Sequence, residues 1–277
     1  FEFRIAILEN KRKLARNPLI KNGMSYEMDF EGLEKQAAEP RNKILILCNP
    51  HNPVGRVWTK EELQRVGEIC FKHNVLVISD EIHADITYQN YQYMPYSKAV
   101  TEDIAQQSFT CISPAKTFNI ASVTDAMVVI PNQEYRQQYE KFVAQYFLGK
   151  SNTFAVAAME SAYRNGGEWL DEFLVYLQNN LDFLKDYLGK HIPKVQLVEP
   201  EGSFLVWLDF SELNMEAKEL ESFLAQKARI ALNSGYWFGR QGAGYARMTI
   251  ACPQSMLKEG LSRLEQAVNA LPDTEAN

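Results

Sequence analysis

The sequence lacks any apolar run near the ~20 residues that a membrane-spanning helix needs. It also lacks an excess of positive charge, because 29 Lys and Arg stand against 35 Asp and Glu, a net charge of −6. Partners such as nucleic acid and anionic membranes favour clustered Lys and Arg, so we expect neither as a partner. The first residues, FEFR, carry no signal-peptide pattern.

Cysteine and histidine are both scarce, with four of each in 277 residues. The cysteines form no CxxC pair, and no two histidines are spaced as metal ligands, which argues against a disulfide scaffold and a zinc site. Each cysteine lies in or beside an apolar run, as reduced core thiols of a cytoplasmic protein commonly do. These four are Cys48, Cys70, Cys111 and Cys252.

Short apolar runs alternate with helical patterns in the first half of the chain. Strands are predicted at 44–47, 75–79, 109–112 and 126–130. Between the first two, a helix is predicted over 59–73, with Thr59 as N-cap and a buried stripe of Leu63, Val66 and Cys70. Buried strands separated by a helix predict right-handed βαβ units and a mainly parallel sheet.

The pattern changes after about residue 150. Helices are predicted over 151–164, over a long leucine-striped segment from 170 to 188, over 216–229 and over 255–270, with strands at 204–210 and 245–250. Gly166 and Gly167 separate the first two helices. We therefore expect an α/β large domain over 1–165 and a smaller α+β domain over 166–277. The chain opens on an expected amphipathic helix with Ile5, Leu8 and Arg12 on one stripe.

The run NPHNPVG at 49–55 directly follows a predicted strand. Open α/β sheets bind ligands at this end of their strands. Two prolines and a glycine favour a rigid loop, and Asn52 offers an amide. A tight strand-to-helix turn with no further role is the alternative.

Asp80, in SDEIHAD at 79–85, ends another apolar strand. A carboxylate is costly to bury there without a partner, and a positively charged ring nitrogen would supply one. The alternative is that Asp80 caps a following helix.

Lys116 lies in SPAKTFN at 113–119, just after the third strand. A lysine at a sheet edge can form an imine with an aldehyde once its amine is deprotonated. A surface lysine in a polar loop is the alternative.

Arg247 lies on the otherwise apolar strand YARMTI at 245–250. Its planar guanidinium suits the carboxylate of a substrate. A buried ion pair with Asp or Glu is the alternative.

The order of these motifs, NPxG, strand-end Asp, SxxK and a late Arg, resembles fold type I pyridoxal-phosphate (PLP) enzymes, the aspartate-aminotransferase-like superfamily. Within it, SDEIHAD, KTFNIA at 116–121, FGxxGxG at 238–244 and RxxIACP at 247–253 are similar to the cystathionine β-lyase/C–S lyase branch. The similarity runs from about residue 1 to 271. It implies a PLP-binding large domain, a small C-terminal domain and a homodimer.

The resemblance implies a role for each candidate residue. Lys116 would hold PLP as a Schiff base, and Asp80 would pair with the ring nitrogen. Asn52 and His83 would lie at the phenolic oxygen of the cofactor. Ser113 and Thr124 would contact the phosphate of the cofactor. Arg247 would bind the carboxylate of an amino-acid substrate.

The implied reaction is β-elimination from cystathionine or cysteine-like amino acids, giving pyruvate, ammonia and a thiol. An aminotransferase using the same residues, or a catalytically silent or regulatory protein of this fold, stays open. Family members have a further segment ahead of the part that resembles Phe1, which supplies much of the phosphate site. We therefore expect this chain alone to bind PLP weakly, and to bury its apolar surface against a partner.

Overall fold

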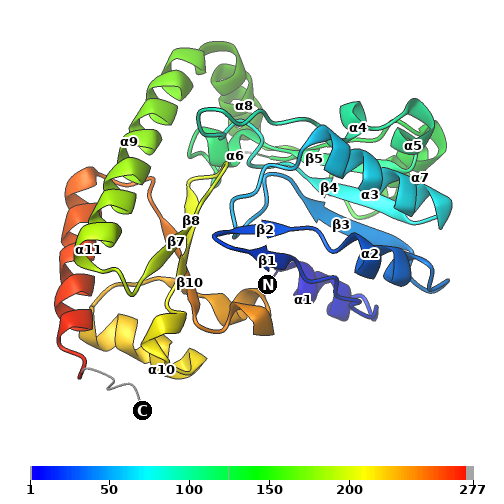
Figure 1. Ribbon diagram of the computed structural model, residues 1–277. Helices are drawn as coiled ribbons and strands as arrows, with labels where there is room; N and C mark the ends of the chain where they lie inside the picture. Colours follow the sequence, from blue (N-terminus) through cyan, green and yellow to red (C-terminus); the bar gives the residue numbers. More distant parts are fainter. Residues whose placement is uncertain (1, 124, 273–277) are drawn as a thin grey trace.

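The computed structural model describes residues 2–123 and 125–272 of the chain. Two four-stranded sheets stand side by side, each with its own helices, and the long helix α9 runs along the outer flank of the second (Figure 1). None of the helices described is long and apolar enough to cross a membrane.

The first sheet has the strand order β3-β4-β5-β6. β3, β4 and β5 run parallel and β6 is antiparallel, so the predicted mainly parallel sheet is confirmed. Its strands are β3 (Ile44–Cys48), β4 (Leu76–Asp80), β5 (Ser108–Ile112) and β6 (Met127–Val129). Its helices are α3 (Lys60–Lys72), α4 (Tyr96–Ala99), α5 (Glu102–Ala105), α6 (Pro114–Thr117) and α7 (Gln133–Gln145).

The predicted helix after β3 is confirmed as α3, including its cap. Thr59 accepts a hydrogen bond from the backbone N–H of Glu62, and the Glu62 carboxylate accepts one from the N–H of Thr59. This reciprocal capping box satisfies two N–H groups that the helix itself cannot. The predicted stripe of Leu63, Val66 and Cys70 is buried in the core of the first sheet.

The second sheet has the order β7-β8-β10-β9 and is antiparallel throughout. Its strands are β7 (Gln196–Val198), β8 (Leu205–Asp209), β9 (Asn233–Ser234) and β10 (Tyr245–Thr249). The flanking helices are α9 (Gly167–His191), α10 (Ala217–Ser222) with its π-helical continuation Phe223–Lys227, and α11 (Gln254–Asn269), while α8 (Thr153–Asn165) contacts α6 and α9. Short 3₁₀ turns span Ser211–Leu213, Gly235–Phe238 and Arg240–Gly242.

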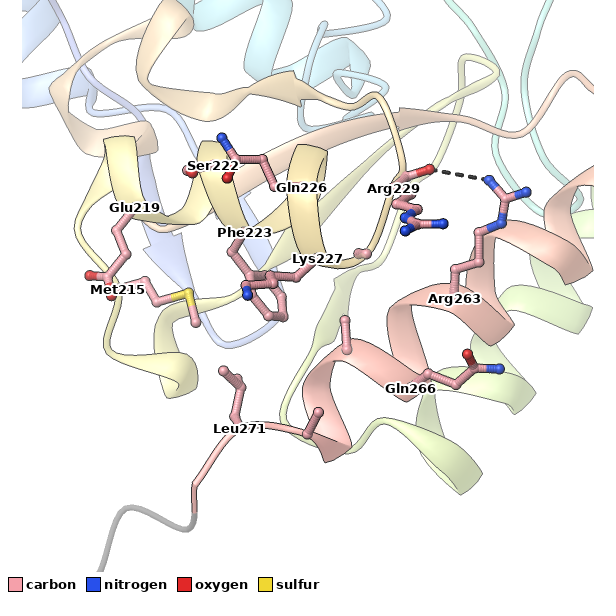
Figure 2. Close-up of a pocket in the computed structure, with 13 residues that line it drawn as sticks. Met215, Glu219, Ser222, Phe223, Gln226, Lys227, Arg229, Arg263, Gln266 and Leu271 are labelled. Atoms are coloured by element: carbon pink, nitrogen blue, oxygen red, sulfur yellow. Dashed lines mark hydrogen bonds between the residues drawn. The ribbon is translucent and has the colours of Figure 1, made fainter.

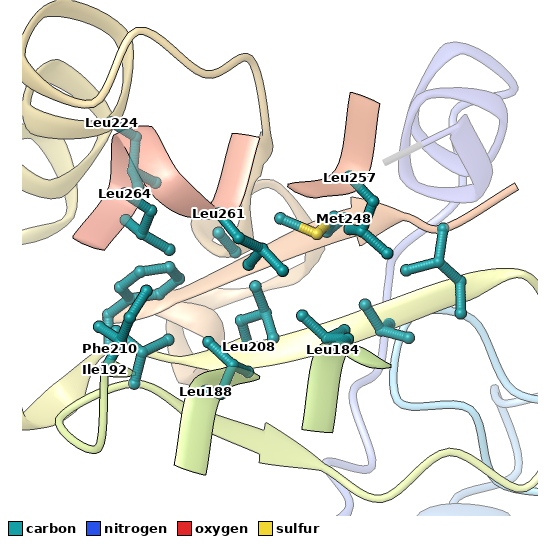
Figure 3. Packing of buried hydrophobic residues seen from close by; sticks show 14 of the residues in the cluster. Leu184, Leu188, Ile192, Leu208, Phe210, Leu224, Met248, Leu257, Leu261 and Leu264 are labelled. Atoms are coloured by element: carbon teal, nitrogen blue, oxygen red, sulfur yellow. The ribbon is translucent and has the colours of Figure 1, made fainter. Parts of the chain in front are cut away.

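The core of the second sheet is built where α9 and α11 pack on the strands (Figure 3). Leu184 and Leu188 of α9 meet Leu208 of β8 and Leu261 and Leu264 of α11 there. The predicted leucine stripe of α9 is therefore buried, but only from Leu177 onward, since its first turns project beyond the sheet. Gly166 separates α8 from α9 as predicted. The domain boundary at 165/166 stays a prediction.

The chain before the first sheet differs from expectation. The opening helix α1 spans only Glu2–Glu9, so Arg12 lies beyond it, and Ile5 and Leu8 are exposed. Three elements that the sequence did not predict follow: β1 (Ile20–Asn22), β2 (Ser25–Glu27) and α2 (Phe30–Ala37). The β1–β2 hairpin reaches the second sheet, where Lys21 Nζ lies 2.6 Å from Asp209 Oδ2.

Candidate active site

The predicted site residues lie on loops at the carboxyl ends of β3, β4 and β5 and on β10 of the second sheet. Because β3, β4 and β5 are parallel, their carboxyl ends share one edge of the sheet. Asp80 stands at this edge between Cys48 and Cys111, its register partners on the neighbouring strands. Burial, with added repulsion from Asp80, raises the pKa of the Cys48 thiol to about 12, which keeps it a protonated core thiol.

Asp80 does not cap a helix. Residues 82–85 form turns, so the alternative interpretation of this carboxylate as a helix cap is wrong. One carboxylate oxygen accepts a bond from the backbone N–H of Ile82 at 3.3 Å, which orients the group at the end of β4. The neighbouring Glu81 is a structural carboxylate, since it accepts bonds from Ser79, Tyr93 and the backbone N–H of Tyr96.

Lys116 is half-buried on the short helix α6, which directly follows β5. The next residue, Thr117, is buried and donates a hydrogen bond of 2.7 Å to Asp85, in the loop after Asp80. This bond joins the lysine turn to the loop that carries Asp80 and His83.

His83 is 2% exposed and lies within the electrostatic reach of both Lys116 and Arg247. Burial is the main cause, and these two cations the second, of a pKa lowered to about 4. His83 is therefore a neutral imidazole at neutral pH. Its Nδ1 lies 3.2 Å from the hydroxyl of Ser203.

Arg247 joins the second sheet to the loop after β3. Its Nη1 donates to the amide oxygen of Asn52 and its Nη2 to that of Asn233, both at 2.8 Å, and its guanidinium lies 4.8 Å from the ring centre of Phe238. Asn233 is placed by the register of β9 against β10, where it faces Arg247. With its oxygen occupied, Asn52 keeps its amide N–H groups for a ligand.

Ser113 is the N-cap of α6 rather than an open donor. Its hydroxyl accepts from the backbone N–H of Ala115 and donates to the carbonyl of Asp125 at 3.0 Å. To contact a phosphate as predicted, Ser113 would have to release one of these bonds. Thr124, the other predicted phosphate contact, lies outside the described residues.

Residues 199–203, here the tether segment, fix both ligand loops in place. The N–H groups of Glu201 and Gly202 bond the carbonyl of Gly55, and Tyr88 and Ser203 donate their N–H groups to Glu201 and Ile86. Gly55 has φ +78°, and a Cβ there would lie 2.8 Å from Pro200 Cβ, so a glycine is required. The loops that carry Asn52 and His83 are thus held by one segment.

A groove of about 1050 Å³ lies elsewhere, between α10 with its continuation and α11 (Figure 2). Lys227, Arg229 and Arg263 contribute to its walls, and Arg263 donates to the carbonyl of Arg229. None of the predicted site residues lines this groove, so we assign the chemistry to the strand-end loops instead.

The residues at the strand ends fit the ring of PLP. Lys116 supplies a half-buried amine, Asp80 a carboxylate at the end of a central strand, and Asn52 amide N–H groups with the oxygen already occupied. Sequence reasoning grouped these residues with His83 and Arg247, and in the structure His83 lies within the electrostatic reach of Lys116 and Arg247 while Arg247 bonds Asn52. It missed Ser203 and Asn233, whose contacts arise from long-range packing that no local spacing encodes.

A model of the family described as aminotransferase class I and II matches residues 12–264. The chain belongs to this PLP-dependent family. Cystathionine beta-lyase PatB of Bacillus subtilis (strain 168) is 38% identical to it over 261 residues, which are 94% of this chain and 67% of that protein.

Two solved structures show the same fold. A PLP-bound structure from Clostridium difficile 630 superposes with a TM-score of 0.93 at 42% identity, covering 96% of this chain and 68% of that one. The PLP-bound C–S lyase from Staphylococcus hominis gives 0.89 at 31% identity, covering 96% and 67%. The chain thus spans about two thirds of the length of these relatives, which fold as PLP-dependent enzymes do.

Proposed function

We propose that this chain carries PLP on Lys116 and catalyses β-elimination from cystathionine or cysteine-like amino acids. The observation that carries the proposal is the convergence of Lys116, Asp80, His83, Asn52 and Arg247, from two sheets, around one edge. The similarity to proteins named cystathionine beta-lyase and C–S lyase gives the reaction class.

Each side chain has one task in this proposal. When bound, PLP withdraws electrons from the α-carbon of the amino acid. Arg247, oriented by Asn52 and Asn233, binds the substrate carboxylate with its planar guanidinium. Asp80 keeps the ring nitrogen protonated by its negative charge, and neutral His83 and Asn52 donate at the phenolic oxygen.

Lys116 is the proposed base. Its Nζ, once released from the cofactor, removes the proton from the α-carbon, and the bond between β-carbon and sulfur breaks as the thiolate leaves with the electron pair. The released enamine takes up water and gives pyruvate and ammonia. Thr117, through its bond to Asp85, holds the turn on which Lys116 lies.

The test is an assay of the chain with PLP and cystathionine, measuring pyruvate, ammonia and homocysteine together. We expect all three in equal amounts over many turnovers. A keto acid formed without ammonia or thiol would indicate transamination instead, the reaction of the family's name. No product from either reaction, with PLP bound, would favour a silent or regulatory role.

We also propose that the chain works as a homodimer in the cytoplasm. Exposed apolar side chains support a partner surface, among them Phe147 at 76% and Phe154 at 79% exposure, and the four free cysteines suit a reducing compartment. Light scattering across a range of concentrations tests the assembly. A single mass of one chain at every concentration would contradict the homodimer.

A further inference from the structure

The ring nitrogen that carries the proton in neutral His83 decides which nitrogen can donate a hydrogen bond to a ligand. A neutral imidazole carries one proton, so one ring nitrogen donates a hydrogen bond and the other accepts one. Burial, with the positive charges of Lys116 and Arg247 nearby, keeps this ring neutral. The nitrogen bonded to Ser203 is Nδ1, which leaves Nε2 as the other.

The hydroxyl of Ser203 has two contacts. Its oxygen accepts from the backbone N–H of Leu205 at 3.2 Å and lies 3.2 Å from Nδ1 of His83. Ser203 is 1% exposed, and among the described residues no third group bonds its hydroxyl. A buried hydroxyl proton needs an acceptor, and Nδ1 of His83 is the one within reach. Nδ1 therefore accepts, and the ring proton sits on Nε2.

Ser203 is held in this place by an unusual backbone. Its φ is +73°, in the left-handed region that favours glycine, and its own N–H is bonded to the carbonyl of Ile86 at 2.8 Å. Non-glycine residues in this region are uncommon and gather at functional sites. Glycine would suit this backbone better, yet a serine stands here and its hydroxyl reaches the site histidine.

We propose that Ser203 is a positioning residue that holds His83 in the Nε2–H tautomer, so that the ring presents a neutral hydrogen-bond donor beside Lys116 and Arg247. Within the described part of the chain no partner bonds Nε2, which leaves this donor for a ligand. Insofar as the inference rests on the proposed function, that ligand atom is the phenolic oxygen of PLP. An acceptor nitrogen there would repel the same oxygen.

The tautomer can be read by NMR on the chain labelled with ¹⁵N-histidine, without PLP or substrate. The chain has only four histidines, and His83→Gln identifies the signals of His83. At neutral pH we expect Nδ1 to resonate as an unprotonated, pyridine-type nitrogen and Nε2 as a protonated, pyrrole-type one. A protonated Nδ1 in the wild-type chain overturns the proposal by itself.

Two variants test whether Ser203 sets the tautomer. Ser203→Gly removes the hydroxyl and suits the left-handed backbone, whereas Ser203→Ala removes the hydroxyl and keeps the strain. In both we expect the two nitrogen shifts of His83 to move toward each other, as the tautomers exchange. Ser108→Ala is the matched control, because it deletes an equally buried hydroxyl that bonds the carbonyl of Ala105. We expect it to leave the His83 signals unchanged.

Unchanged His83 shifts in both Ser203 variants would show that another group sets the tautomer, and the proposal would fall. Should neither variant fold, the wild-type spectrum still decides whether Nε2 is the donor. The lyase assay is separate from this measurement. A correct tautomer with no cystathionine cleavage would refute the proposed function and leave the role of Ser203 standing.

Discussion

Two arginines fix the loop after β3, one within the loop and one on β10, and they do so by different chemistry. Arg56 bonds the carboxylates of Glu62 at 3.0 Å and Glu201 at 2.9 Å, and its Nη1 donates to the carbonyl of Tyr26. Arg247 bonds the amide oxygens of Asn52 and Asn233. A carboxylate brings a negative charge to a guanidinium, whereas an amide oxygen orients it as a neutral acceptor.

This difference gives the two arginines different roles, a structural one for Arg56 and one in the candidate site for Arg247. Arg56 is 8% exposed and joins α3 to the tether segment, so its charges stabilise the fold. Arg247 lies on β10, within the electrostatic reach of His83, and an oriented cation there can receive a carboxylate. The loop after β3 thus contributes to stability through Arg56 and, in the proposed function, to ligand binding through Arg247. If the two contributions are separate, mutation of one arginine should change stability and mutation of the other should change substrate binding.

The largest expected effect is that of Asp80→Asn. The amide keeps the size and the contact with Ile82 but removes the negative charge from the site, so we expect kcat for cystathionine cleavage to fall roughly 10²–10³-fold. The melting temperature should stay close to that of the wild type. Asp171→Asn, an exposed change on α9, is the control. If Asp80→Asn kept the turnover of the wild type, the assignment of Asp80 to the site would be wrong.

The paired variants Arg56→Gln and Arg247→Gln should affect different quantities. Arg56→Gln leaves two carboxylates without their cation, so we expect the free energy of unfolding to fall by about 3–5 kcal/mol. Arg247→Gln removes charge-assisted bonds to the substrate, so KM should rise about 10- to 100-fold with a much smaller loss of stability. Urea unfolding and initial rates measure the two. If both variants changed the free energy of unfolding and KM to the same extent, stability and substrate binding would not be separable in this way.

The pH dependence of stability should reveal the buried His83. Its folded pKa, lowered by burial from 6.5 to about 4, means that the unfolded chain binds more protons in this window. Stability contributed by neutral His83 is therefore present above the unfolded pKa and is lost as pH falls toward 4. Relative to wild type, His83→Gln should lose roughly 3 kcal/mol less between pH 7 and pH 4.

Urea unfolding at both pH values measures this difference. His51, whose pKa burial and Arg56 also lower to about 4, is untouched by the change and keeps its own share of the pH dependence. An identical loss in wild type and His83→Gln would mean that His83 is protonated as easily in the folded as in the unfolded chain.

The smallest expected effect is on stability alone, and it comes from a change at the N-cap of α3. Thr59→Ala removes one half of the capping box of α3, which costs about 1 kcal/mol of stability. Because α3 supplies none of the candidate site residues, kcat and KM should stay unchanged. Thermal unfolding and initial rates check both expectations, and a change in KM would show that the helix controls the site.

The sequence predicted those parts of the fold that have a strong local pattern. All four strands of the first sheet were predicted because each lies in a short apolar run, and the helix α3 because it has a cap and an apolar stripe. The missed strands β1, β2 and β7 have three residues each, too few for periodicity. Helix α7 has no buried residue, so it offers no apolar stripe to detect.

The site was predictable where residues follow strands directly. Asp80 is the last residue of β4 and Lys116 lies shortly after the end of β5, and these positions are visible in the sequence. Ser203 is 120 residues from His83 in sequence, and Asn233 meets Arg247 only through the pairing of β9 with β10. The first contact depends on how the two sheets are placed and the second on the register of β9 against β10, and local spacing encodes neither.

The central claim is that Lys116 is the residue that holds PLP, and a single mapping experiment tests it most directly. The chain is incubated with PLP, reduced with borohydride and digested, and the pyridoxyl mass is located by mass spectrometry. We predict the label on Lys116, its loss in Lys116→Arg and its retention in Lys98→Arg. A label found only on other lysines, such as Lys98 or Lys150, would contradict the claim.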